Sequence, residues 1–517
     1  MRTLILFAFV LASPVFAQQR NHFLLPSAQL AESRFGSASA IEGDLAVVGR
    51  DGQGPGQAFG FDVQSGAQIL DLVPSIGSGG DRFGGAIALD ESMIAIGARL
   101  LDLATFNDGA VFVFDRATGQ EVMILTGSSS VSNGRLGTSV ALGGEFIAAG
   151  APHSSSSNQA RAYLFDRATG AELQAIEQPG SSAFGASIAV DAQFLLVGAP
   201  GDPINGLASG AAYIYDTSTG DLRWQLSPAD GNANDEFGFR VALADGLAIV
   251  SAPGKEGISH ASQGVVYVFD AQTGDELARI DPLDPDTDNR FGTSLSTDGA
   301  TLAIGSPIDD LVKTNSGSVY VYELAGLQPI GEFAALDVDP FDRFGASVSI
   351  DFPNVVVGSA WDGPNCSQRG SAHLFTIDPD QAPGSNECSP AEANSSGLPG
   401  RLSFAWGGDL AKGNFLQLAA TDLPAFGFGY FLVAGQPANI PMAGGSSGTL
   451  CLGGEIGRLS SQVHLISGSG TLSVGVDLAE LPLSPVRPAQ PGETWRFQAW
   501  FRDGQTSNFT NARAVVF

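Results

Sequence analysis

A Phe-Gly dipeptide recurs at a nearly constant interval through residues 22–378 and constrains the fold more than any other feature. Six occurrences are in phase with this interval, and Leu136-Gly137 fills the one gap, so the chain holds seven copies spaced 48, 53, 48, 53, 54 and 53 residues apart. The copies begin at Phe35, Phe83, Leu136, Phe184, Phe237, Phe291 and Phe344. A repeat of this length is a small structural unit that buries its apolar face only against its neighbours. The sequence therefore predicts an array of seven similar units.

Each copy contains four short segments with the pattern of β-strands, which we name A to D. Strand A alternates, as in residues 184–190, and strand B is an apolar run that ends in small residues, as in 195–200. Strand C alternates aromatic and β-branched residues, as in 265–270, and strand D is shorter, as in 276–280. Alternation with a period of two and enrichment in such residues are typical of strands. The predicted fold class is all-β.

The turn between strands C and D has the form Asp-x-x-Thr-Gly, as in Asp270 to Gly274. The Asp side chain is able to cap such a turn, and the Gly suits the position with a positive φ that ends a three-residue hairpin loop. This turn predicts that strands C and D form a hairpin.

Seven four-stranded units with a period near 50 residues predict a seven-bladed β-propeller over residues 18–378. A closed ring removes the exposed strand edges that a linear array would leave. The seventh copy has strands A (344–350), B (355–358) and C (372–377) but lacks strand D before the composition changes at Pro379. The segment Phe23–Pro26 stands just before the first copy and has the pattern of strand D. We expect this segment to complete blade seven and so close the ring.

The series Phe-Gly, Val-Gly-Ala-Pro and Gly-x-Val-Tyr-Val-Phe resembles the FG-GAP repeat, which builds the propeller of integrin α subunits and of many exported bacterial proteins. The resemblance covers about 350 residues and implies that the Phe packs between neighbouring blades while the Gly permits close approach of the backbones. Integrin-type repeats often carry a calcium loop between strands A and B. The A–B loops here are minimal, as at 41–44, 89–92 and 142–145, and do not supply the oxygens that calcium prefers. The chain resembles the calcium-free bacterial form.

The B–C and D–A loops of a propeller emerge on one face of the disc, and here they are long and varied. We expect this face to bind a partner, because binding residues concentrate on loops over a rigid scaffold. Its D–A loops are acidic at 230–236, 281–289 and 337–342. Asp284, Asp286 and Asp288 are candidate calcium ligands by their spacing. That loop lacks the sixth-position Gly and closing Glu of an EF-hand, so a solvated turn with no cofactor is favoured and a calcium site is the alternative.

The charge balance disfavours some partners, and the N-terminus indicates an exported protein. The chain has 25 Lys and Arg against 54 Asp and Glu, a net charge of −29, which disfavours nucleic acid and anionic membranes as partners. Residues 1–17 have the form of a signal peptide, with Arg2, an apolar run and a cleavage site after Ala17. No other apolar stretch is long enough to span a membrane. We expect a secreted, periplasmic or cell-surface protein with a protein or glycan partner.

A second domain is expected at 398–517, after a Pro- and Ser-rich linker at 379–397. Eight short strands predict an antiparallel β-sandwich, with Trp495, Phe497, Ala499 and Phe501 on one face of its most regular strand. The domain resembles C-terminal modules of exported bacterial repeat proteins. That resemblance implies a Cys388–Cys451 disulfide and leaves Cys366 free; Cys366–Cys388 is the alternative.

No catalytic residues are predicted. The five His are isolated in sequence, although His153 and His260 fall on the expected binding face. Gly444–Gly448 matches the Gly-x-Ser-x-Gly motif of a nucleophile elbow, but it lies in a flexible Gly/Ser loop. The C–D turns are similar to those of quinone-dependent propeller dehydrogenases, but only Trp224 matches the Trp of that pattern. We therefore expect a non-enzymatic binding protein. The alternatives are a secreted hydrolase or oxidoreductase with a site in the central channel, and a structural envelope component.

Overall fold

A computed structural model shows how the repeat folds. It describes residues 18–377 apart from gaps at 27–32, 53, 55, 130, 153–159, 179, 257–261, 283–288, 310–314, 334–340 and 363–368. Beyond residue 377 it describes 385–388, 401–407, 415–421, 423–424, 427–441, 449–459, 464–466, 472–477, 481–483, 494–503, 506–510 and 512–516. The chain separates into a compact unit of residues 20–327 with 332–376 and a second unit that contains 377–517. The predicted signal peptide, residues 1–17, lies outside the described residues.

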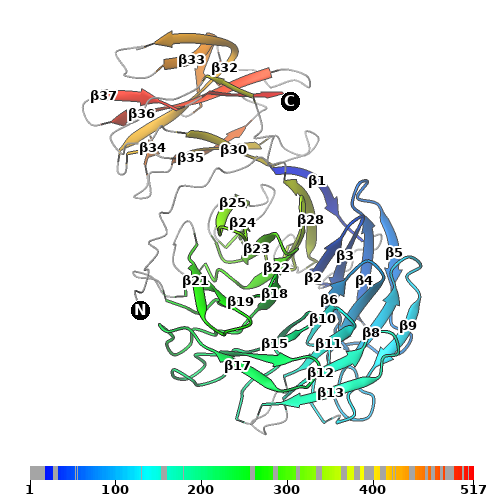
Figure 1. Cartoon of the computed structure of the whole chain (residues 1–517). Helices are drawn as coiled ribbons and strands as arrows, with labels where there is room; N and C mark the ends of the chain where they lie inside the picture. The colour runs from blue at the N-terminus through cyan, green and yellow to red at the C-terminus, as the bar shows by residue number, and fades with distance from the viewer. Residues whose placement is uncertain are drawn as a thin grey trace. The chain divides into compact units, whose positions relative to one another are not determined.

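The first unit consists of seven four-stranded antiparallel sheets, which confirms the predicted propeller (Figure 1). Blades one to three are formed by β2 (Phe35–Glu42), β3 (Leu45–Arg50), β4 (Gln57–Asp62) and β5 (Gln68–Leu72); β6 (Phe83–Leu89), β7 (Met93–Ala98), β8 (Ala110–Asp115) and β9 (Glu121–Leu125); and β10 (Ser139–Gly143), β11 (Phe146–Ala151), β12 (Arg161–Asp166) and β13 (Glu172–Glu177). Blades four to six are formed by β14 (Ser187–Val190), β15 (Phe194–Ala199), β16 (Ala211–Asp216) and β17 (Leu222–Leu226); β18 (Val241–Ala244), β19 (Leu247–Ala252), β20 (Val265–Asp270) and β21 (Glu276–Ile280); and β22 (Ser294–Thr297), β23 (Thr301–Ser306), β24 (Ser318–Glu323) and β25 (Gln328–Phe333).

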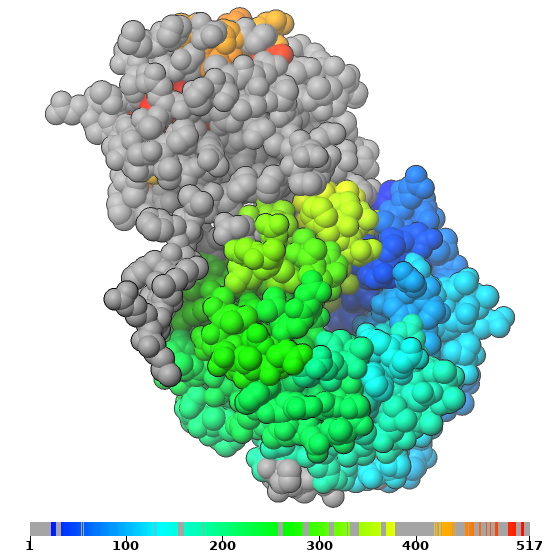
Figure 2. Space-filling view, in the orientation of Figure 1, coloured from blue at the N-terminus to red at the C-terminus, as the bar shows by residue number. Residues whose placement is uncertain are grey.

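Blade seven closes the ring with the first strand of the chain. Its strand order is β1 (Gln18–Leu24), β28 (Ser371–Ile377), β27 (Asn354–Ser359) and β26 (Ser347–Asp351), so β1 supplies the missing strand D. The blue start and the yellow-green end of the propeller lie side by side in Figure 2. The strand begins and ends earlier than predicted, at Gln18 and Leu24 rather than Phe23 and Pro26, but the predicted pairing is confirmed.

The Phe-Gly dipeptide joins neighbouring blades, as the repeat predicts. Phe83 is fully buried and packs with residues of blade one, such as Val47, as well as with Phe112 of its own blade. The Gly after each Phe or Leu has a φ between 85° and 91°. A β-carbon on Gly97 of strand B would lie 1.9 Å from the carbonyl oxygen of Gly137. These glycines therefore bring the backbones of adjacent blades into direct contact.

The C–D turns form as predicted. Asp115 accepts hydrogen bonds from the Thr118 amide at 2.9 Å and the Thr118 hydroxyl at 2.6 Å, and Gly119 has a φ of 67°. These bonds stabilise the charged form, so they lower the pKa of the Asp115 carboxyl below its usual value.

The second unit contains two antiparallel sheets. One contains β29 (Ser385–Cys388), β38 (Ala512–Val516), β36 (Thr494–Asp503), β32 (Phe428–Pro441) and β33 (Thr449–Arg458), with β34 (His464–Leu465) and β37 (Thr506–Phe509) beside them; the other contains β30 (Arg401–Gly407), β31 (Phe415–Thr421) and β35 (Leu472–Asp477). Trp495, Phe497, Ala499 and Phe501 are buried in one core with Leu418 of β31, which confirms the face predicted for β36.

The structure corrects the predicted linker in one place. Ser385–Cys388, inside 379–397, forms β29 and pairs with β38, so these four residues belong to the second domain. A four-residue strand without alternating apolar residues gives no strand signal in the sequence, which explains the error. β37 was not predicted either.

Candidate functional site

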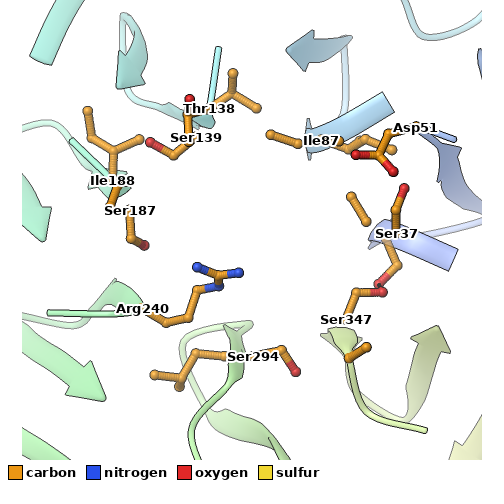
Figure 3. A pocket seen from close by; sticks show the side chains of 18 of the residues that line it. Ser37, Asp51, Ile87, Thr138, Ser139, Ser187, Ile188, Arg240, Ser294 and Ser347 are labelled. Atoms are coloured by element: carbon orange, nitrogen blue, oxygen red, sulfur yellow. Dashed lines mark hydrogen bonds between the residues drawn. The ribbon is translucent and has the colours of Figure 1, made fainter. Parts of the chain in front are cut away.

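The seven A strands surround a central channel that encloses a cavity of about 400 Å³ (Figure 3). All seven blades contribute to its wall, because each strand A begins beside the channel; small residues follow the Phe-Gly or Leu-Gly dipeptide in six blades, and Phe239 and Arg240 follow it in blade five. The wall combines hydroxyl groups, such as that of Ser139, with aliphatic side chains such as Ile87 and Ile188. A cavity of this size is within the range of ligand pockets.

Most of the wall hydroxyls already donate a hydrogen bond to the next blade. Ser139 and Ser294 donate to the carbonyl oxygens of Gly185 and Gly345, both at 2.8 Å, and Ser347 donates to that of Gly36 at 3.1 Å. A hydroxyl has one proton and two lone pairs. The oxygens of Ser139 and Ser294 therefore remain available to the channel as hydrogen-bond acceptors, while their protons hold neighbouring blades together. The Ser347 oxygen already accepts a hydrogen bond from the Ser39 hydroxyl at 3.1 Å.

Arg240 places a positive charge inside this channel. Its half-buried side chain projects into the open centre of the ring in Figure 3. Nη1 donates to the Phe239 carbonyl at 3.0 Å, and Cζ lies 4.7 Å from the centre of the Phe239 ring. Burial lowers the pKa of Arg240 to about 10, so the guanidinium is protonated at neutral pH. Within the described ranges, no carboxylate forms an ion pair with it.

Three further arginines gather around one carboxylate at the channel wall. Asp51 is buried, and its carboxylate oxygens lie 3.3 Å from Arg34 Nη1 and 3.1 Å from Arg99 Nη2. Arg82 donates to the Asp51 carbonyl at 2.9 Å. Burial lowers the pKa of Arg99, and the neighbouring Asp51 charge opposes this shift. One negative charge among three guanidinium groups leaves a local excess of positive charge in a strongly acidic protein.

An arginine ring accounts for part of this charge. Arginine stands immediately before the Phe-Gly or Leu-Gly dipeptide in five of the seven blades, always with a φ between 53° and 61°: Arg34, Arg82, Arg135, Arg290 and Arg343. These positions end the D–A loops, so the ring lies on the face formed by the B–C and D–A loops. Sequence reasoning missed this ring, although the recurring Arg-Phe-Gly tripeptide is its signal.

The acidic D–A loop at 230–236 is ion-paired rather than simply solvated. Asp235 is buried, and its carboxylate lies 2.9 Å from Lys255 Nζ. Asp230 pairs with Arg279 at 2.6 Å and accepts a hydrogen bond from the Tyr267 hydroxyl at 2.8 Å. The pKa of Asp230 is lowered: burial raises it, but these hydrogen bonds and charges outweigh burial. The acidic residues Asp230 and Asp235 therefore stabilise this loop itself.

The B–C loops are tied to the D–A loops of the next blade. The amides of Asn133 and Arg135 donate to the carbonyls of Phe106 and Asn107 at 2.7 and 3.0 Å. The amide of Asn234 donates to the carbonyl of Leu207 at 2.8 Å in the same way. These bonds give the loop face a defined shape.

Several residues singled out from the sequence are not brought into this site. Asp284, Asp286 and Asp288 lie outside the described residues, as do His153, His260, Cys366 and the Gly444–Gly448 loop. Among the described residues, no group of three or more His, Cys, Asp or Glu side chains is arranged to hold a metal ion. His373 is buried in β28 between aromatic rings, in agreement with a structural role.

The cysteine pairing stays a prediction. Cys451 is buried in β33, where its amide donates to Gln498 Oε1 at 2.9 Å. The side chain of Cys388 is outside the described part of the chain.

No helix in the described part of the chain is long and apolar enough to cross a membrane.

The fold and its channel define a seven-bladed β-propeller with a separate β-sheet domain. Five segments match the FG-GAP repeat, at residues 67–114, 171–215, 223–269, 275–322 and 330–375. Each match begins at a strand D and ends in strand C of the next blade, in register with the sheets. The chain is an FG-GAP repeat propeller protein, which confirms the resemblance drawn from its motifs. No curated protein matches it.

Proposed function

We propose that this protein is an exported, non-enzymatic binding protein whose B–C and D–A loop face holds a protein or glycan partner outside the cell. The observation that carries the proposal is the position of the exposed apolar side chains. Among the described residues of the propeller, every large apolar side chain that is exposed in a loop lies on this face: Leu25, Val73, Ile76, Leu103, Phe106, Ile204, Leu207 and Phe341. Apolar side chains that gather on one surface are typical of interaction sites.

The opposite face supports the same choice. Its A–B and C–D turns are short and closed by polar side chains such as Asp115 and Asp166, and the described turns expose no large apolar residue. The binding face instead presents Phe106 and Leu207, which are 62% and 76% exposed, on loops held by backbone hydrogen bonds. Ordering such loops on binding costs little conformational entropy, which favours affinity.

The proposal also includes export of the protein from the cell. The form of residues 1–17 and the strongly acidic composition support secretion through a signal peptide that is cleaved after Ala17. Edman sequencing or intact-mass analysis of the protein from its native cells tests this part. A mature chain that starts at Gln18 supports export, and an intact N-terminus in the cytoplasm contradicts it.

The binding face is tested with the mature chain on panels of immobilised extracellular polysaccharides and proteins. The double variant Phe106→Ser with Leu207→Ser is expected to bind the captured partner at least tenfold more weakly, because such side chains supply the apolar contacts. The matched control is Leu173→Ser with Leu277→Ser, which removes apolar side chains that are 49% and 55% exposed on the outer strands. A partner that depends on the control pair and not on the loop pair would assign binding to the rim and refute this face.

A further inference from the structure

Arg240 is a departure from the repeat. It is the second residue after its Phe-Gly dipeptide, and small residues occupy the same place in the other six blades: Ala38, Ala86, Ser139, Ser187, Ser294 and Ser347. Those blades form the same four-stranded sheet without a charged side chain there. The fold therefore does not require an arginine at this position, and its presence needs another explanation.

The guanidinium of Arg240 is poised to donate hydrogen bonds. The one hydrogen bond it makes in the described structure is from Nη1 to the Phe239 carbonyl, and the Phe239 ring lies against its face. A guanidinium has five N–H donors in a planar fork that matches a carboxylate. Burial without a carboxylate partner is unfavourable for the charge, and a bound anion relieves that cost.

The channel wall complements the arginine with the opposite hydrogen-bonding character. Ser139 and Ser294 use their protons between blades, so their oxygens are left as acceptors for a ligand that fills the channel. The aliphatic side chains of Ile87 and Ile188 line the same cavity and suit C–H groups. A ligand that matches this wall carries one carboxylate, several hydroxyl donors and apolar ring faces.

We propose that the central channel binds a small polyhydroxylated carboxylate of the hexuronic acid class, with its carboxylate on Arg240 and its hydroxyls on the serine oxygens. The cavity of about 400 Å³ has room for such a ring. The positive excess around Asp51 attracts a single negative charge toward the channel despite the net charge of −29. This inference deepens the proposed function and rests on the propeller being a binding module.

Isothermal titration of the mature full-length chain with D-glucuronate tests the proposal. D-Glucose keeps the hydroxyls and ring but lacks the charge, and acetate keeps the carboxylate but lacks the hydroxyls. Both are expected to bind at least tenfold more weakly than glucuronate, because each satisfies only one half of the site. Absence of glucuronate binding overturns the proposal, and equal binding of glucose or acetate overturns the ligand class.

Two variants test whether the Arg240 charge binds the carboxylate of the ligand. Arg240→Ser installs the residue that other blades carry, and glucuronate affinity is expected to fall tenfold or more, since hydrogen bonds to charged groups are the strong ones. The matched control is Arg223→Ser, which removes the same charge from a side chain that is 53% exposed on β17. Unchanged affinity in the Arg240 variant, or an equal loss in the control, contradicts the proposal.

Arg240→Lys covers the case in which the serine variant does not fold. Lysine keeps the charge but loses the planar fork, so an intermediate affinity is expected, and wild-type affinity would refute the pairing. The two proposals also fail separately. If the loop-face variants abolish partner capture but glucuronate does not bind, this inference alone is wrong. If glucuronate binds and the loop variants have no effect, the proposed loop face is wrong.

Discussion

Substituting Gly97 by alanine probes the contact that sets the spacing of the blades. A β-carbon there would lie 1.9 Å from the carbonyl oxygen of Gly137 and 2.8 Å from its carbonyl carbon. Favourable contacts between carbon and oxygen begin near 3.3 Å, so the backbones of blades two and three would have to separate by more than about 1 Å. Ile96 and Ala98 on either side are fully buried, so β7 has no free space into which to move.

The expected loss of stability follows from this overlap. Inserting a carbon into a well-packed interior usually costs 1–3 kcal/mol, and a rigid backbone contact belongs at the upper end, at about 3 kcal/mol. With an unfolding entropy of about 2.1 cal/mol/K per residue over roughly 360 residues, that loss lowers Tm by roughly 4 °C. Differential scanning calorimetry of the full chain measures the shift in the propeller transition.

Gly79→Ala is the matched control, because a β-carbon on Gly79 meets nothing within 4 Å and its φ is not positive. Its Tm is expected to change by less than about 1 °C, as for most surface substitutions. If Gly97→Ala and Gly79→Ala give the same Tm, close approach of the backbones does not limit blade spacing and the reasoning is refuted.

Two further predictions concern the turns and the cysteines. Hydrogen bonds from the Thr118 and Thr169 hydroxyls and amides hold the pKa values of Asp115 and Asp166 below normal; their stabilising effect is therefore complete above the unfolded-state value of about 4 and is lost as pH falls below it. A Tm series from pH 7 to pH 3 should show a decline that is shallower in Asp166→Asn, and an identical decline would contradict this. Unreduced peptide mapping of the mature protein should recover a Cys388–Cys451 linked peptide, whereas a Cys366–Cys388 peptide would favour the alternative.

The repeat made the ring predictable before any coordinates were considered. Seven in-register Phe-Gly or Leu-Gly dipeptides specify seven blades, and the missing strand D after Ile377 requires an extra strand, which Phe23 and its neighbours supply. The alternation around Trp495 likewise identified the buried face of β36. These predictions succeeded because local periodicity and burial agree at every copy.

The residues that line the channel were not predicted, because they are neighbours only across blades. Arg34, Arg82 and Arg99 lie up to 65 positions apart in the sequence, yet all contact Asp51. In the linear sequence these arginines are isolated basic residues of an acidic protein. In the closed ring, residues about 50 positions apart in the sequence lie next to each other. Only the register of the seven A strands shows which side chains share the channel.

Departures from the repeat are the positions that packing between blades does not explain. The constant Phe and Gly residues are explained by packing between blades, as the fully buried Phe184 and the positive φ of Gly185 show. Arg99 instead replaces the proline that follows strand B in blades three to six, and Arg240 replaces a small residue. Both departures lie on the channel wall and bring positive charge there. Arg99 pairs with the buried Asp51, whereas blade geometry gives no such partner to Arg240 among the described residues, so Arg240 is the departure that the proposed channel ligand best explains.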